Sequence, residues 1–170
     1  MKDEIYYFHQ SPPELAKDII DNISFYYDDV VLEPFAGENA FYDNIPYFDE
    51  MTKYRCEIED DGGDFRDFDY EGIKPTMILS NPPFRLDGKN AFFDILRFFS
   101  KIRSVKRIIF LCSDICYSSL TPMRMMKINE EGMFLQKITT CCIKKWKGRY
   151  RVLYFGRERS DAFDYYMDTY

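Results

Sequence analysis

The sequence has little that would support a metal site or a disulfide framework. It contains one histidine, and its five cysteines are an odd number without the paired CxxC spacing of zinc sites. We therefore expect the cysteines to be reduced and packed in the core, and we expect no bound metal. No apolar run approaches the ~20 residues that span a membrane, and residues 1–4 are too acidic for a signal peptide. These absences predict a soluble cytoplasmic protein without a membrane partner.

The glycine-rich loop of dinucleotide-binding proteins is also missing. No GxGxxG motif occurs in the sequence, which argues against an NAD-linked enzyme. Repeats and low-complexity linkers are absent, and 170 residues suffice for one domain with a sizeable core. We expect residues 1–170 to form a single domain that has no separate target-recognition domain.

The charge is unevenly divided along the chain, although the net charge is only −6. Residues 1–100 contain 9 Lys and Arg against 22 Asp and Glu, whereas residues 101–170 contain 14 against 7. An acidic first part and a basic second part suggest that a polyanion approaches one face only. Ordinary solvated surface charge explains the same distribution equally well.

The most informative stretch is a short apolar run that two prolines end abruptly. Residues 77–79 are predicted to form a buried strand, so Asn81 falls at its carboxyl end, where open α/β sheets bind ligands. Because proline fixes φ and lacks a backbone donor, Pro82 and Pro83 form a rigid corner. The Asn81 amide oxygen and the Pro82 carbonyl could accept hydrogen bonds from an amino group on a flat ring, with Phe84 stacked on that ring. The alternative is an ordinary Asn-Pro turn with Phe84 in the core.

A second unit of strand and loop precedes this corner. Residues 30–32 are predicted to form a short buried strand that leads into a loop over 33–39 and then a helix from about Ala40. Such units begin many nucleotide sites, because small residues let the backbone approach the ligand. The loop contains one glycine, Gly37, which by itself does not define a nucleotide site.

Acidic residues then occupy positions that suit a nucleoside. Residues 53–58 form the next predicted strand, and Glu57 lies 20 positions after Gly37, near the offset at which a carboxylate meets a ribose diol. The alternative is a surface carboxylate. Asp64 and Phe65 could accept from an adenine amino group and cover its ring, or Asp64 could simply cap a turn. No helix is evident between 59 and 70.

The remaining segments complete an α/β pattern. Ser11 is predicted to cap a helix whose first residue is Pro12, with Glu14 completing a capping box. The other expectations are helices over 12–23 and 91–101, a polar loop over 85–90, a strand over 107–112, a partly helical stretch over 114–127 in which Met125 and Met126 pack, and strands over 136–146 and 149–156. The last two strands predict a hairpin, and its candidate phosphate-binding residues are Lys144, Lys145, Lys147, Arg149 and Arg151.

In order and spacing, these motifs resemble those of the class I S-adenosylmethionine-dependent methyltransferases, over roughly residues 9–155. The resemblance is to the amino-methylating branch, whose best-known members are N6-adenine methyltransferases, and to small stand-alone methylases of phages and viruses. It implies a Rossmann-like fold with a mostly parallel sheet, a C-terminal antiparallel hairpin and abbreviated helices. It also implies S-adenosylmethionine as the cofactor and nucleic acid as the substrate.

The resemblance assigns a role to each matching residue. The catalytic motif is matched by Asn81, Pro82, Pro83 and Phe84. The cofactor-binding positions are matched by His9, Gln10, Ser11, Pro12, Glu33, Pro34, Phe35, Gly37, Glu57, Ile58, Asp64, Phe65 and Asn81. Within this set the resemblance places residues 9–12 beside the methionine end of the cofactor, Glu57 at the ribose, and the pair Asp64 and Phe65 at the adenine.

Two residues depart from the family pattern. Asn39 stands where a second loop glycine is common, a change expected to reshape the loop or weaken cofactor binding. Asn81 replaces the acidic residue usual in many DNA adenine enzymes, and this variant is frequent in RNA adenine, guanine-N2 and protein glutamine methylases. The target class therefore stays open on this residue alone.

The expected function is N6-methylation of adenine in nucleic acid, with DNA favoured over RNA. A base inside a duplex must be flipped out to reach such a site, where Phe84, together with Tyr117 or Phe134, would stack on it. The alternatives are a methyltransferase for another amine, namely guanine N2 or protein glutamine, and a non-catalytic partner subunit with this fold. A protein partner that supplies target recognition is compatible with each.

Overall fold

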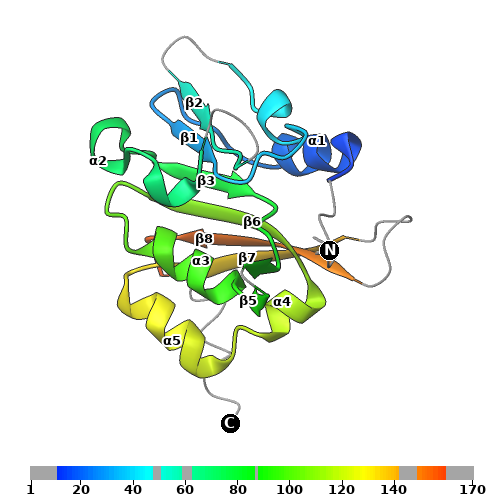
Figure 1. The fold of residues 1–170 in the computed structure, drawn as a ribbon, viewed down its shortest axis with the longest axis vertical. Helices are drawn as coiled ribbons and strands as arrows, with labels where there is room; N and C mark the ends of the chain where they lie inside the picture. The colour runs from blue at the N-terminus through cyan, green and yellow to red at the C-terminus, as the bar shows by residue number, and fades with distance from the viewer. Residues whose placement is uncertain (1–10, 48–50, 59–62, 87, 142–148, 160–170) are drawn as a thin grey trace, which may run out of the picture.

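A computed structural model describes residues 11–47, 51–58, 63–86, 88–141 and 149–159. Its centre is a six-stranded sheet (Figure 1). In spatial order the strands are β2 (Thr52–Arg55), β1 (Val30–Glu33), β3 (Met77–Ser80), β6 (Arg107–Ser113), β8 (Tyr150–Gly156) and β7 (Phe134–Cys141). The first four run parallel, and β8 and β7 add antiparallel to β6. The predicted parallel sheet with a terminal antiparallel hairpin is confirmed.

The order of the four parallel strands contains one reversal of direction. From β1 the chain moves outward to β2, then returns past β1 to β3 and continues to β6 on the other side. The reversal lies between β1 and β3, and ligands of open α/β sheets bind at this position, outside the carboxyl ends of the strands. We call the sheet edge where the parallel strands end the carboxyl edge, and the opposite one the amino edge.

Successive side chains of the central strands pack into two hydrophobic cores, one on each face of the sheet. Leu32 and Ile78 face the helices α3 (Phe92–Ser100) and α5 (Pro122–Glu130), which Figure 1 shows on one side of the sheet. Val31 and Met77 face α1 (Pro13–Asp21) and the short 3-10 helix η1 (Tyr42–Asn44). Because β1 and β3 are buried on both faces, they consist of continuous apolar runs, as parallel strands do.

Several helices are short, as expected. The chain between β2 and β3 contains only the 3-10 turn η2 (Phe65–Asp67) and α2 (Tyr70–Ile73) in its described part. The stretch expected to be partly helical forms α4 (Asp114–Ser118) and α5. Thr121 caps α5 by accepting from the Arg124 backbone, with Pro122 in the first turn.

Other predictions of local structure were wrong. No helix begins near Ala40; the chain there forms turns and η1, because Asn39 has a positive φ and Pro46 follows shortly. The polar loop is instead a small antiparallel ribbon of β4 (Arg85–Leu86) and β5 (Lys89–Asn90). On α5 the side chain of Met125 packs against the core, but Met126 is exposed.

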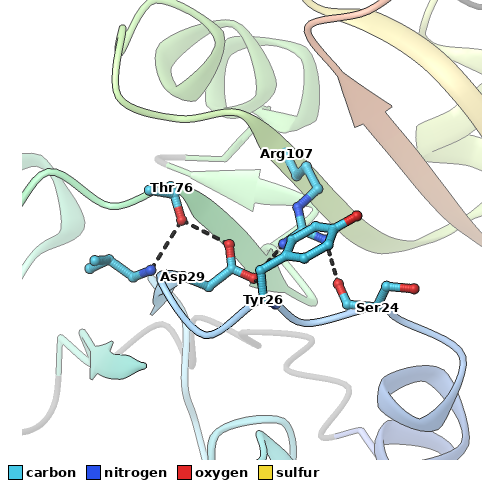
Figure 2. A network of polar contacts seen from close by, with 6 residues as sticks. Ser24, Tyr26, Asp29, Thr76 and Arg107 are labelled. Carbon is cyan, nitrogen blue, oxygen red and sulfur yellow. Dashed lines mark hydrogen bonds and ion pairs between the residues drawn. The ribbon is translucent and has the colours of Figure 1, made fainter. Parts of the chain in front are cut away.

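At the amino edge, a polar network joins the starts of three strands (Figure 2). Asp29, which is 5% exposed, accepts from the Tyr26 backbone at 2.7 Å, from the Thr76 hydroxyl at 3.1 Å and from Arg107 at 2.5 Å. Thr76 also accepts from the Val30 N–H at 3.0 Å. Because Asp29, Thr76 and Arg107 adjoin β1, β3 and β6, this network fixes the relative positions of the strands.

Near the same edge, Arg157 holds the helices on one face of the sheet in place. Arg157, just after β8, donates to the backbone carbonyls of Ser100, Ile102, Val105 and Glu131 at 2.6–3.0 Å. These carbonyls lie at or beyond the carboxyl ends of α3 and α5, where helical carbonyls lack intrahelical partners. Within the described residues, no helix has both the length and the apolarity to cross a lipid bilayer.

Candidate functional site

Two of the predicted site residues, Glu33 and Asn81, lie at the reversal point of the sheet. Glu33 is the last residue of β1, and Asn81 directly follows β3, which pairs with β1. Pro82 is buried and Pro83 half-buried, so the corner is held by packing as well as by its restricted backbone. Phe84 is half-buried and packs against both cores.

Asn81 contacts a residue 70 positions away in the sequence. Its Nδ2 donates to the Ser11 hydroxyl oxygen at 3.2 Å, and Ser11 is buried. The predicted helix cap was therefore wrong: Pro12 occupies the cap position of α1 without a side-chain hydrogen bond, because the Ser11 hydroxyl faces Asn81 instead. The contact joins the segment predicted to adjoin the cofactor to the proposed catalytic residue.

The loop after β1 keeps a glycine-like backbone despite its asparagine. Gly37 has a φ of 51° and Asn39 a φ of 65°, both in the left-handed region. Asparagine is one of the few residues other than glycine that adopt this region readily. Asn39 therefore supplies the conformation expected of the second glycine. In the same loop, the Phe35 ring packs against that of Phe65, tilted by 59° with 4.8 Å between the ring centroids.

Glu57 connects this loop to the end of β2. The strand ends at Arg55, two residues before Glu57, rather than at Ile58 as predicted. One carboxylate oxygen accepts from the Gly37 N–H at 2.5 Å and the other from the Ile58 N–H at 2.9 Å. Carboxylate oxygens have further lone pairs, so Glu57 retains the capacity to accept from a ribose diol. Ile58, next to it, is 67% exposed, which is unusual for an isoleucine.

Asp64 and Phe65 begin η2 and have partners within the protein. Asp64 caps η2 through the Arg66 N–H at 2.8 Å and pairs with the Arg66 guanidinium, which lowers the pKa of the Asp64 carboxyl. Phe65 is buried, with its ring against those of Phe98 and Phe99. The capping alternative for Asp64 is confirmed, and the predicted contacts of this pair with adenine stay a prediction.

Glu33 has an unusual environment for a carboxyl group. It is 1% exposed, and its Oε2 has no hydrogen-bond partner in the described structure. Burial raises its pKa well above the ordinary value, the neighbouring Asp43 and Glu57 raise it further, and the Tyr42 backbone N–H lowers it. A buried carboxyl oxygen without a hydrogen-bond partner is costly unless a donor or a cation meets it.

Of the basic residues expected to bind phosphate, the structure describes Arg149 and Arg151. Arg151 is engaged within the protein: it pairs with Asp114 at 2.6 Å and lies over the Tyr117 ring at 4.6 Å. Arg149 is exposed where β8 begins, at the carboxyl edge. The other phosphate-binding candidates, Lys144, Lys145 and Lys147, lie outside the described residues. The same is true of two predicted cofactor-binding residues, His9 and Gln10.

The two aromatic candidates for stacking on a base lie at opposite edges. Tyr117 belongs to α4, which follows β6 at the carboxyl edge. Phe134 pairs with Gly156, which pairs with Arg107 at the start of β6, so Phe134 lies at the amino edge. Phe134 is therefore too far along the sheet to stack beside Asn81, an error that arose because the sequence does not give the register of β7.

The described cysteines are free thiols, as expected. Burial raises the pKa of Cys56 to about 11, and it also raises those of Cys112 and Cys116, so these thiols stay protonated at neutral pH and are poor nucleophiles. Across the described ranges, no cluster of three or more His, Cys, Asp or Glu residues could hold a metal ion.

The sequence prediction missed several residues that shape the site. Ser80 is fully buried beside Asn81, and its hydroxyl has no partner among the described residues. Lys53 and Arg55 reach from β2 to the loop after β1. Because Lys53 and Arg55 are two positions apart on a predicted strand, their side chains share one face of the sheet. This spacing was the sequence signal that could have identified them.

No protein-family model matches the sequence, and no curated protein sequence matches it significantly. Solved structures do match. A modification subunit of a candidate type I restriction enzyme from Vibrio vulnificus aligns with a TM-score of 0.63 and 13% identity, over 89% of this chain and 45% of that one. A candidate RNA methyltransferase from Pyrococcus horikoshii aligns at 0.51 and 14%, over 85% and 80%. TYW2 from M. jannaschii, solved with S-adenosylmethionine, aligns at 0.51 and 13%, over 88% and 77%.

These similarities establish the fold. The chain has the Rossmann-like fold of class I S-adenosylmethionine-dependent methyltransferases, and it spans less than half the length of the Vibrio subunit. The predicted fold class is thereby confirmed.

Proposed function

We propose that this protein transfers a methyl group from S-adenosylmethionine to the N6 amino group of adenine in nucleic acid, with DNA favoured over RNA. The observation that carries the proposal is the position of Asn81. It follows β3 at the reversal point of a methyltransferase fold, in a corner made rigid by two prolines, and Ser11 holds its amide at 3.2 Å.

The residues at the carboxyl edge fit the proposed cofactor. S-adenosylmethionine supplies, when bound, a methyl group on a positively charged sulfur next to an amino acid and an adenosine. The unpaired Oε2 of Glu33 suits a cationic or N–H donor partner, which would offset the cost of burying the carboxyl. Glu57 would hold the ribose diol, and the exposed Ile58 would cover one face of the adenine.

The chemistry of the acceptor is assigned to the rigid corner. An aromatic amine is a weak nucleophile, because its lone pair is delocalised into the ring. Hydrogen bonds from its N–H groups to the Asn81 amide oxygen and the Pro82 carbonyl would favour a pyramidal nitrogen and stabilise the charge that develops there. Ser11 supports this role, because it binds the amide nitrogen and thereby orients the amide oxygen.

Access of the base follows from the same geometry. A base must leave the helical stack before its amino group can meet a corner of this kind, so single-stranded or flipped adenine is the expected acceptor. Phe84 and Tyr117 are the candidates for stacking on it. The basic residues 144, 145, 147 and 149 would bind the backbone phosphates, and a restriction-modification subunit among the proteins with this fold supports nucleic acid as the polymer.

The test is methyl transfer with S-adenosylmethionine labelled on its methyl group. We would incubate the purified protein with single- and double-stranded DNA and RNA, digest the polymers and separate the nucleosides. Label in N6-methyladenine is the expected result. Label only in guanine, or only in added protein, would support the alternative amine acceptors. Binding of the cofactor without transfer, even to adenine oligonucleotides at high concentration, would support a partner subunit.

A further inference from the structure

In its described part, the loop between β1 and β2 contains no α-helix of the kind that commonly supports a nucleotide loop. After Gly37 the backbone makes turn bonds only: the Asn39 N–H donates to the Ala36 carbonyl at 2.8 Å and the Asp43 N–H to the Asn39 carbonyl at 2.9 Å, and the Asn44 and Ile45 N–H groups donate to the Phe41 carbonyl at 3.0 Å. The 3-10 turn η1 then ends at Asn44. Without a helix, the loop has to be held in shape by other groups.

Asn39 is the position in this loop where the backbone conformation is least favourable. Its φ of 65° lies in the left-handed region, which disfavours residues with a Cβ by roughly 1–2 kcal/mol. Asparagine reduces that cost when its short amide side chain finds a hydrogen-bond partner. The identity of the partner therefore determines how firmly the loop is held.

That partner is Arg55, the last residue of β2. Its Nη1 donates to the Asn39 Oδ1 at 3.0 Å, and both residues are half-buried. A β-strand within a sheet is a rigid support, so the guanidinium is anchored independently of the loop. The contact connects the loop to the same strand end from which the chain continues to Glu57.

Lys53 makes a parallel contact two residues earlier on the same face of β2. Its Nζ donates to the Tyr42 carbonyl at 2.9 Å and to the Ile45 carbonyl at 3.3 Å, and it lies 4.6 Å from the centre of the Tyr42 ring. The Tyr42 N–H in turn bonds to Glu33. Two cations of one strand thus hold both the loop and the turn that follows it.

We propose that Arg55 is a positioning residue, which keeps Asn39 in the left-handed conformation and so shapes the loop around Gly37 for the cofactor. Lys53 does the same for the turn at Tyr42. In this chain, the pair of Asn39 and Arg55 replaces a glycine. The inference rests on the proposed function only in naming S-adenosylmethionine as the ligand of the loop.

The test is a double-mutant cycle between Asn39→Gly and Arg55→Ala, read out by calorimetric titration with S-adenosylmethionine. Glycine adopts a positive φ without help, so we expect Asn39→Gly to keep the dissociation constant within about twofold. Arg55→Ala alone should raise it about tenfold. In the Asn39→Gly background the same change should raise it less than about threefold, because the group that Arg55 holds is gone.

A second readout needs no cofactor. Amide hydrogen exchange at Gly37 and Asn39 should accelerate in Arg55→Ala, and Arg55→Ala should have no such effect in the Asn39→Gly background. Thr52→Ala, an exposed change on the same strand, is the control and should leave both readouts unchanged. A melting temperature measured for each variant separates loss of the fold from loss of loop shape.

The outcomes distinguish this inference from the proposed function. If the wild type fails to bind S-adenosylmethionine, the proposed function fails, and hydrogen exchange still decides the role of Arg55. If the wild type binds but Arg55→Ala has the same effect in both backgrounds, in titration and in exchange, Arg55 does not act through Asn39 and the inference is overturned.

Discussion

The amino and carboxyl edges of the sheet differ in how far their buried polar groups are hydrogen-bonded within the protein. At the amino edge, the Asp29 carboxylate has three donors, and the network that it forms with Thr76 and Arg107 joins β1, β3 and β6. At the carboxyl edge of the same strands, the Oε2 of Glu33 and the hydroxyl of Ser80 are buried without partners among the described residues. A polar group without a partner is costly. The Ser104 hydroxyl, in the loop before β6, and the Arg97 Nε also lack one in the described part of the chain, but Glu33 and Ser80 lie at the carboxyl ends of β1 and β3, where a ligand would supply what the protein does not.

This difference also predicts which residues contribute to stability and which to function. Groups with all their hydrogen bonds made inside the protein fix the strands, and their removal should lower stability. Groups left incomplete beside a rigid corner contribute little to stability, and their removal should lower binding or turnover. Each of the following variants compares the edges on that basis.

The largest effect is expected at Asn81. Asn81→Ala removes the acceptor for the substrate amine, and losing one preorganised partner typically reduces turnover ~10²–10³-fold. The dissociation constant for S-adenosylmethionine should stay within a few-fold, as measured by titration beside the labelled-transfer assay. Asn22→Ala, at an exposed asparagine at the carboxyl end of α1 whose side chain donates locally to the Asp18 carbonyl, is the matched control and should retain full turnover. Equal loss in both variants would separate Asn81 from the chemistry.

The next effect is a loss of stability at the amino edge. Arg107→Ala leaves the buried Asp29 carboxylate without its cation, and we expect a loss of about 2–3 kcal/mol in the free energy of unfolding. Urea denaturation would measure it, and Arg103→Ala, an exposed arginine nearby, should change it by no more than about 0.5 kcal/mol. Folded Arg107→Ala should bind the cofactor like the wild type. A large change in cofactor affinity would contradict the separation of the two edges.

Charge reversal tests which cations bind the polymer. Changing Lys144, Lys145 and Lys147 to Glu should weaken polynucleotide binding about tenfold or more, and should make its log–log salt dependence shallower by about 2–3. The control is the same change at three exposed cations near the amino edge, Lys101, Arg103 and Lys106. Equal losses in the two triple variants would mean that net charge alone governs binding.

The smallest effect concerns Glu33 and depends on pH. Burial raises the pKa of Glu33, so the folded protein holds this proton more tightly than the unfolded chain does. Its contribution to stability is complete below the ordinary pKa of 4.5 and is lost as the pH rises through the raised value. Glu33→Gln should match the wild type at acidic pH and exceed its stability at alkaline pH, while cofactor affinity falls. Urea denaturation across a pH series checks this, and Glu71→Gln, on the exposed α2, should follow the wild type throughout.

The positions of the central strands were predictable from the sequence, because they depend on local signals. Apolar runs over 77–79 and 107–112 can only be buried, and the prolines after Asn81 end β3 wherever the chain folds. The 20-residue offset between Gly37 and Glu57 predicted a ribose contact for Glu57, which stays a prediction; the hydrogen bond between the Gly37 N–H and the Glu57 carboxylate was not predicted.

Contacts between distant segments were not predictable in the same way. The Ser11 hydroxyl had a plausible local partner in the backbone of α1, and only tertiary structure brings Asn81 into competition for it. The α-helix expected near Ala40 does not form because Asn39 has a positive φ, and Arg55, on a neighbouring strand, stabilises that conformation. The register of β7, which places Phe134 at the amino edge, is set by pairing with β8. It cannot be predicted from the amino-acid composition of either strand.

The central claim is that the carboxyl edge at the reversal between β1 and β3 binds S-adenosylmethionine. Calorimetric titration of the wild type and of Glu57→Ala tests it most directly, because Glu57 is the residue assigned to the ribose and lies against the Gly37 loop. We predict saturable one-to-one binding that Glu57→Ala weakens by at least about tenfold while the protein stays folded. Absence of binding by the wild type, or an unchanged affinity in Glu57→Ala, would contradict the account.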